Sequence, residues 1–87
     1  MFYVYVLKSK KKTDQIYTGY STNLKRRLSE HNNGKSSATK PYLPWKIIFY
    51  EAYISMRDAK RRETYLKTTK GRRAVKLMLR DSLVSEG

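Results

Sequence analysis

The strongest constraint on the fold is a pair of β-type segments at the start of the chain. Phe2–Lys8 and Gln15–Tyr20 are rich in β-branched and aromatic side chains, and the polar stretch Ser9–Asp14 between them is short enough for a turn. We therefore predict a β-hairpin, in which Gly19 marks a bulge or a close approach. The period of two assigns the first strand's side chains to two faces: Phe2, Val4 and Val6 on one, Tyr3, Tyr5 and Leu7 on the other.

The rest of the chain predicts helices and one more strand. We expect a first helix that is capped by Ser21 or Thr22 and ends at Asn33-Gly34, followed by a buried strand at Trp45–Tyr53. A second helix should run from Ser55 to about Thr68. Lys70-Gly71 should separate it from a third helix at Arg72–Leu83. Val84–Gly87 are expected to fray. With 87 residues, we expect one α+β domain over residues 1–87.

The charge balance predicts a polyanionic partner. The net charge is +13 and the pI is about 10.2. Residues 57–80 hold ten basic side chains against the acids Asp58 and Glu63: Arg57, Lys60, Arg61, Arg62, Lys67, Lys70, Arg72, Arg73, Lys76 and Arg80. This excess of clustered basic residues favours nucleic-acid binding over a solvated helix surface. An anionic membrane is disfavoured because the amphipathic stripe is short and poor in bulky aromatics.

Cysteine and histidine usage limits the metal chemistry. The chain has no cysteine and one histidine, so disulfides, thiolate sites and His-rich zinc sites are excluded. A metal would be a hard cation held by oxygen, such as Mg²⁺ or Mn²⁺. No apolar run approaches the roughly 20 residues that span a bilayer, and the start of the chain lacks signal-peptide features. We expect a cytoplasmic protein with no membrane partner.

Two helical positions are candidates for phosphate chemistry. On a wheel of about 100° per residue, Leu24, Leu28 and His31 share a face, and Arg27 lies at its edge. Arginine can bind phosphoryl oxygens through two hydrogen bonds, and histidine can orient water. Periodicity alone leaves two plainer interpretations open, namely a surface cation at Arg27 and a partner of the helix dipole at His31.

Glu63 is the most informative residue of the second helix. It falls within the inward stripe that Met56, Ala59 and Leu66 define, where an unpaired carboxylate would cost several kcal/mol. Either Glu63 pairs with Arg27 or a lysine, or it is a metal ligand in a basic cleft. Tyr5 and Tyr17 are likewise either half-buried strand aromatics or groups that act on water.

The ordered set of motifs resembles the GIY-YIG nuclease family over nearly the whole chain. The motifs are Tyr3-Val4-Tyr5, Tyr17-Thr18-Gly19, Asn23–Leu28, His31-Asn32 and Ala59-(x3)-Glu63. The chain is most similar to small single-domain members, which are related to the N-terminal nuclease domain of an excision-repair excinuclease. This resemblance implies a three-stranded antiparallel sheet flanked by three or more helices, a nuclease activity, and a role in DNA repair.

The resemblance also implies site residues and a cofactor. The family's catalytic residues fall on Tyr5, Tyr17, Arg27, His31 and Glu63, with Glu63 as ligand of one divalent cation, Mg²⁺ or Mn²⁺. Tyr17 would be the leading candidate for general base, Arg27 would stabilise transition-state charge, and Tyr5 and His31 would position water or phosphate. The sequence departs from the family at Tyr3, Val4 and Thr18, and it has no asparagine after Asn33.

Two functions fit these features. The first is a metal-dependent endonuclease that hydrolyses nucleic-acid phosphodiester bonds, DNA rather than RNA, with little sequence specificity. The second is a non-catalytic nucleic-acid-binding module on the same fold. The sequence leaves open whether the protein acts in a larger complex or as a homodimer. Eight cations are predicted to bind nucleic acid: Lys25, Arg26, Lys60, Arg61, Lys67, Lys70, Arg72 and Arg73.

Overall fold

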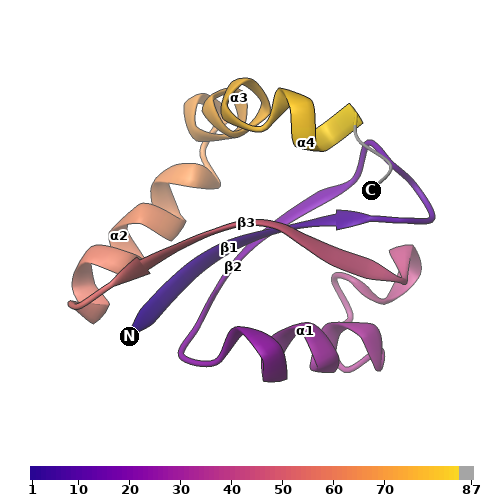
Figure 1. Ribbon diagram of the computed structural model, residues 1–87, viewed down its shortest axis with the longest axis horizontal. Helices are drawn as coiled ribbons and strands as arrows, with labels where there is room; N and C mark the ends of the chain where they lie inside the picture. The colour runs from indigo at the N-terminus through magenta and orange to yellow at the C-terminus, as the bar shows by residue number, and fades with distance from the viewer. Residues whose placement is uncertain (85–87) are drawn as a thin grey trace.

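A computed structural model describes residues 1–84 of the protein (Figure 1). The elements are β1 (Phe2–Ser9), β2 (Ile16–Ser21), α1 (Leu24–Asn32), the short 3₁₀ helix η1 (Lys40–Tyr42), β3 (Trp45–Tyr53), α2 (Met56–Leu66), α3 (Thr69–Met78) and α4 (Arg80–Val84). The strands form one antiparallel sheet in the order β2-β1-β3. The predicted α+β fold with a three-stranded antiparallel sheet is therefore confirmed. Fraying was predicted for Val84–Gly87. Residues 85–87 lie outside the described residues, and Val84 is the last residue of α4.

The helices cover both faces of this sheet. α2, α3 and α4 lie on one side of it and α1 on the other (Figure 1). On the α2 side, Val4 and Val6 of β1 pack with buried side chains of α2 and α3, including Leu66 and Val75. On the α1 side, Tyr5 and Leu7 pack with Trp45, Leu24 and Leu28. The predicted division of the first strand between two faces is confirmed, and it makes β1 the buried centre of the molecule.

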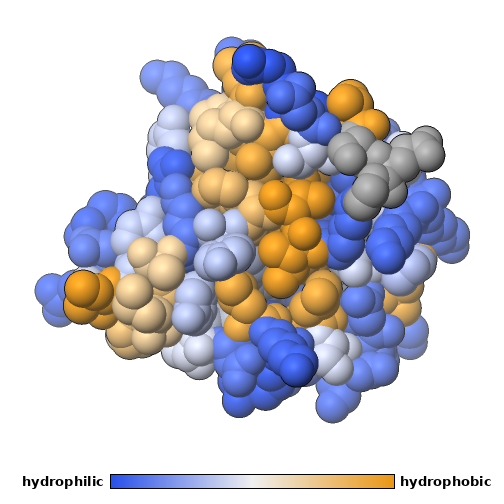
Figure 2. All heavy atoms as spheres, viewed as in Figure 1, coloured by the Kyte–Doolittle hydropathy of each residue, from blue (hydrophilic) through white to orange (hydrophobic). Residues whose placement is uncertain are grey.

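The prediction that the third strand is buried is wrong. β3 is an edge strand that pairs with β1 alone, and most of its side chains are half-buried. Tyr50, directly opposite Tyr5, is 57% exposed. Figure 2 shows apolar residues gathered across the middle of the visible face, where β3 runs in Figure 1, with hydrophilic residues around them. Apolar runs predict strands well, but they do not say which strand takes the centre.

The caps of two helices differ from the prediction. α1 is capped by Asn23, whose side chain accepts a hydrogen bond of 3.0 Å from the Arg26 amide. Ser21 instead bonds the backbone of Asn23, and this leaves Asn23 as the residue that faces the first helical turn. Ser55 occupies the N-cap position of α2, but its side chain makes no capping hydrogen bond. The predicted end at Asn33-Gly34 is confirmed, with Gly34 at φ 73°.

The predicted break at Lys70-Gly71 is also misplaced. α2 ends at Leu66, and Thr68 caps α3 by accepting a 3.0 Å hydrogen bond from the Gly71 amide. Gly71 thus lies inside the first turn of α3. A Cβ at this position would overlap the Tyr65 carbonyl and the backbone of Leu66. Glycine is needed here because it permits close packing of α3 on the end of α2, and not because it ends a helix.

We predict that Gly71→Ala destabilises the protein by about 1–3 kcal/mol, because the added methyl group would push α3 away from the α2 backbone. Urea unfolding of the two proteins measures this difference. Lys70→Ala is the control, since Lys70 is exposed in the same turn and its loss should change stability by less than about 0.5 kcal/mol. Equal stability of the two variants would contradict the packing role of Gly71.

Candidate active site

Tyr5 anchors the candidate site from the central strand. Its side chain is 1% exposed, and its hydroxyl lies 2.9 Å from His31 Nε2. Gly19 is opposite Tyr5 on β2, and a Cβ at position 19 would overlap the Tyr5 ring. The close approach predicted at Gly19 is therefore confirmed, and its partner is this ring. Because Gly19 has no side chain, Tyr5 can lean over β2 toward α1.

His31 is held from both ring nitrogens inside the protein. It is fully buried, and its Nδ1 lies 2.8 Å from Thr39 Oγ1. The Thr39 hydroxyl donates to the Ser36 carbonyl, so Nδ1–H donates to Thr39 and Nε2 accepts the Tyr5 proton. Burial lowers the pKa of His31, as does the neighbouring Arg27 charge. Although His31 lies in the last turn of α1, its contacts are with Tyr5 and Thr39.

Arg27 connects this buried pair to the surface. Its side chain is 36% exposed, and Nη1 is 3.1 Å from Glu30 Oε1. The guanidinium also lies close enough to the Tyr5 hydroxyl to act on its pKa. Burial raises the pKa of Tyr5 to about 12, and Arg27 opposes this rise only in part. Tyr5 therefore keeps its proton at neutral pH, and Arg27 is more than a surface cation.

Tyr17 and Glu63 approach the same place from β2 and α2. The Tyr17 ring packs edge-on against His31 with centroids 5.1 Å apart. Glu63 is 18% exposed, and its Oε2 lies 3.1 Å from the Lys67 ammonium. The predicted partial burial of Glu63 is thus confirmed. Of the interpretations left open, the structure shows an ion pair with a lysine, and the role of Glu63 as a metal ligand stays a prediction. The stripe used to place it was partly wrong, since Met56 is 50% exposed while Ala59 and Leu66 are buried.

The five predicted catalytic residues share one region. Tyr5 contacts His31 directly, and Arg27, Tyr17 and Glu63 are close enough to act on the pKa of Tyr5. Two strands and two helices on opposite faces of the sheet supply these side chains. The arrangement combines one half-exposed guanidinium, one carboxylate and two phenols, which suits chemistry on a phosphate. The individual catalytic roles remain predictions.

The residues present fit a hard divalent cation. Within residues 1–84, no group of three or more His, Cys, Asp and Glu side chains could hold a metal ion. Glu63 supplies a single half-buried carboxylate. Mg²⁺ commonly binds through one or two carboxylates and completes its shell with water and substrate phosphate. A single carboxylate beside a phosphate-binding arginine therefore suits Mg²⁺ or Mn²⁺ and does not suit a structural zinc site.

The eight cations predicted to bind nucleic acid are all exposed: Lys25, Arg26, Lys60, Arg61, Lys67, Lys70, Arg72 and Arg73. Two of them line the β2 edge, where the Lys60 ammonium lies 4.0 Å from the Tyr20 ring centroid and that of Lys67 lies 5.6 Å from the Tyr17 centroid. Arg26 and Arg61 form exposed ion pairs with acids of their own helices. The role of the eight in binding remains a prediction.

Sequence reasoning missed two residues that complete the site. Glu30 pairs with Arg27, and this position could have been found, because it lies three residues further on the same helix. Thr39 fixes the His31 ring and accepts, through its carbonyl, a 2.9 Å hydrogen bond from the Trp45 indole. No pattern points to Thr39, since it precedes η1 in an irregular loop.

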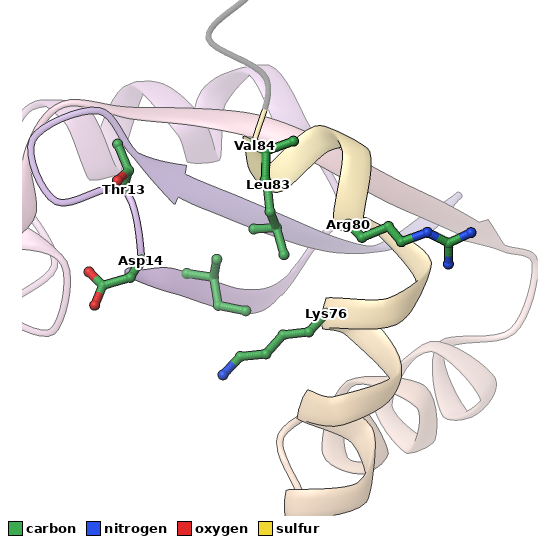
Figure 3. Close-up of a pocket in the computed structure, with 7 residues that line it drawn as sticks. Thr13, Asp14, Lys76, Arg80, Leu83 and Val84 are labelled. Atoms are coloured by element: carbon green, nitrogen blue, oxygen red, sulfur yellow. The ribbon is translucent and has the colours of Figure 1, made fainter.

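A cavity of about 400 Å³ lies elsewhere, between the β1–β2 turn and α3–α4 (Figure 3). Its lining contains none of the predicted catalytic residues: Thr13, Asp14, Ile16, Lys76, Arg80, Leu83 and Val84. In Figure 3 the Arg80 guanidinium points away from Thr13 and Asp14. The cavity is therefore separate from the cluster around Tyr5.

Comparison with known proteins places this chain in a class of nucleases. The family described as "GIY-YIG catalytic domain" matches residues 1–76, so the chain belongs to the GIY-YIG nuclease family, as the sequence motifs predicted. A UPF0213 protein of Clostridium perfringens is 34% identical over 87 residues, covering 99% of this chain and 91% of that protein. A UPF0213 protein of Staphylococcus haemolyticus is 36% identical over 77 residues, covering 87% and 92%.

A third relative, a UPF0213 protein of Streptococcus agalactiae, is 44% identical over 66 residues, covering 75% of this chain and 73% of that protein. Family membership implies that the protein binds nucleic acid. Within residues 1–84, no helix is both long and apolar enough to span a bilayer.

We predict that folding stability falls as pH falls through about 6.5, the ordinary pKa of histidine in an unfolded chain. The folded pKa of His31 is lowered, so the unfolded state binds the proton first, and the stabilisation present above pH 6.5 is lost below it. At pH 5 the loss reaches up to about 2 kcal/mol. His31 is the only histidine, so His31→Gln should abolish this part of the pH dependence in urea unfolding. Equal pH dependence in both proteins would contradict this account.

Proposed function

We propose that the protein is a metal-dependent endonuclease that hydrolyses phosphodiester bonds in DNA with little sequence specificity. The observation that carries the proposal is the convergence of Arg27, Tyr17 and Glu63 around the buried Tyr5–His31 pair, in a chain that belongs to a nuclease family. Hydrolysis adds water across a P–O bond, so the site must neutralise the phosphate, take a proton from water and assist the leaving oxygen.

Arg27 is suited to hold the phosphate. Its guanidinium remains protonated and can donate two parallel hydrogen bonds to phosphoryl oxygens. Its ion pair with Glu30 holds it beside Tyr5, which lowers the cost of ordering this long side chain on binding. The ion pair with Glu30 is partly exposed, so a phosphate dianion or diester can compete for the guanidinium.

The two tyrosines are suited to different roles. Tyr5 is buried, its pKa is raised to about 12, and its proton is directed at His31. It is therefore a positioning group that holds His31. Tyr17 is more exposed than Tyr5, and its ring packs on His31. Tyr17 is our candidate for the group that orients the attacking water and accepts its proton.

Glu63 is our candidate for the metal ligand. A bound Mg²⁺ or Mn²⁺ would supply Lewis-acid stabilisation of the charge that develops on the phosphate and on the leaving oxygen. The protein's part is to present one carboxylate from α2, already partly buried, on the flank of the cluster opposite α1. Proteins of the excision-repair class use such domains, so a role in DNA repair is part of the proposal.

We expect the wild-type protein to nick plasmid DNA with Mg²⁺ or Mn²⁺, and Glu63→Gln to lower the rate by at least about 100-fold, because the metal loses the carboxylate that we propose as its ligand. The matched control is Asp58→Asn, an exposed acid of α2 paired with Arg61, which should cleave like the wild type. DNA binding without metal-dependent cleavage would favour the alternative, a non-catalytic binding module on the same fold.

DNA affinity should depend steeply on salt. For each phosphate that the basic helices contact on duplex DNA, the slope of log K against log salt should change by about −0.9. The double variant Arg72→Gln, Arg73→Gln should flatten the slope by up to about 1.8, while Lys11→Gln in the β1–β2 turn should leave it unchanged. A flat salt dependence in the wild type, measured by fluorescence anisotropy, would contradict phosphate binding by these helices.

A further inference from the structure

Lys67 touches two groups of the candidate active site at once. It is the C-cap residue of α2, and its ammonium lies 3.1 Å from Glu63 Oε2 and 5.6 Å from the Tyr17 ring centroid. The Lys67 side chain is 45% exposed and that of Glu63 is 18% exposed, so the ion pair faces solvent. One cation thus bridges the proposed metal ligand on α2 and the proposed base on β2.

Helical spacing explains the contact of Lys67 with Glu63 but not its contact with Tyr17. A glutamate four residues before a lysine is a favourable pair on any exposed helix. The contact with Tyr17 does not follow from that spacing, because Tyr17 belongs to β2. Lys60 provides a comparison on the same helix, since its ammonium lies 4.0 Å from the ring centroid of another β2 tyrosine, Tyr20. Lys67 differs in that it also neutralises Glu63.

A divalent cation at Glu63 is incompatible with this arrangement. The carboxylate oxygen that pairs with Lys67 is a donor atom that the cation would take, and two positive charges at such short range repel each other. The lysine stem is flexible, so its ammonium can turn away from Glu63 without a change in the helix. Tyr17, over which the ammonium already lies, is where the scissile phosphate must come for attack by water.

We propose that Lys67 is an active-site residue with alternative partners. Without metal it is the counter-ion of Glu63 and competes with the divalent cation. Once a cation binds Glu63, the ammonium contacts the scissile phosphate beside Tyr17. The inference rests on the proposed nuclease function, and it assigns Lys67 a direct part in the reaction in addition to its predicted contribution to the basic surface.

Metal binding tests the competition without DNA or turnover. Free Mn²⁺ is titrated with the protein and followed by its electron paramagnetic resonance signal. Removal of the competing ammonium in Lys67→Met should lower the apparent Kd for Mn²⁺ roughly two- to fivefold. Lys67→Arg and Lys60→Met should bind Mn²⁺ like the wild type, and Glu63→Gln should not bind it at this site. An unchanged Kd in Lys67→Met would overturn the proposal.

Cleavage at saturating Mn²⁺ and DNA tests the phosphate contact. Lys67→Met should be slower than the wild type by roughly tenfold or more despite its tighter metal binding, and Lys67→Arg should restore most of the rate. Lys11→Met, which removes the same charge from the distant turn, should cleave like the wild type. An undiminished rate in Lys67→Met would overturn the proposal, leaving an ordinary helical ion pair.

The two proposals fail in different ways. A wild-type protein that binds Mn²⁺ through Glu63 but cleaves no DNA would overturn the nuclease function, and the phosphate contact of Lys67 with it. An active wild type whose Lys67→Met variant matches it in both Mn²⁺ affinity and rate would overturn only the role of Lys67.

Discussion

The hydrogen bond between Tyr5 and His31 is the contact on which the rest of the site depends. It joins the central strand to α1 inside the protein, where a hydroxyl or imidazole without a partner would be costly. Gly19 gives the Tyr5 ring its space, and Thr39 gives the His31 ring its orientation. Thr39 also binds the Trp45 indole, so the same network connects α1, the η1 loop and β3. The position of Arg27 follows from this framework.

The site places its charged groups on either side of that network. Arg27 reaches the Tyr5 hydroxyl from α1, while Glu63 and Lys67 approach Tyr17 from α2. Because α1 and α2 lie on opposite faces of the sheet (Figure 1), a phosphate at the β2 edge can meet cationic groups from both. The Glu63 carboxylate beside them is the group that we propose binds a divalent cation. Binding alone would not require Glu63 in this position, which is why we favour hydrolysis over simple binding.

The sequence predicted the fold class because its strands alternate clearly. The ordered motifs pointed to side chains that the structure brings into one region, while their catalytic roles stay predictions. It predicted the boundaries less well. Asn23 rather than Ser21 caps α1. Ser21 still belongs to β2, and its hydroxyl forms hydrogen bonds with the backbone of Asn23. The sequence suggested that Gly71 breaks a helix. In the structure a glycine is needed at this position because it packs against the α2 backbone, and such a tertiary contact cannot be predicted from the local sequence. The role of Thr39 could not be predicted, because hydrogen bonds between a loop residue and distant side chains produce no periodic pattern in the sequence.

The central claim is that the hydrogen bond between Tyr5 and His31 organises a site that hydrolyses phosphodiesters. A double-mutant cycle on the cleavage rate with Tyr5→Phe and His31→Gln tests it most directly. Each single variant should slow cleavage by roughly tenfold or more, and the double variant should be little slower than the worse single one, because both remove the same contact. Full activity in the single variants, or strictly multiplicative losses in the double variant, would contradict the account.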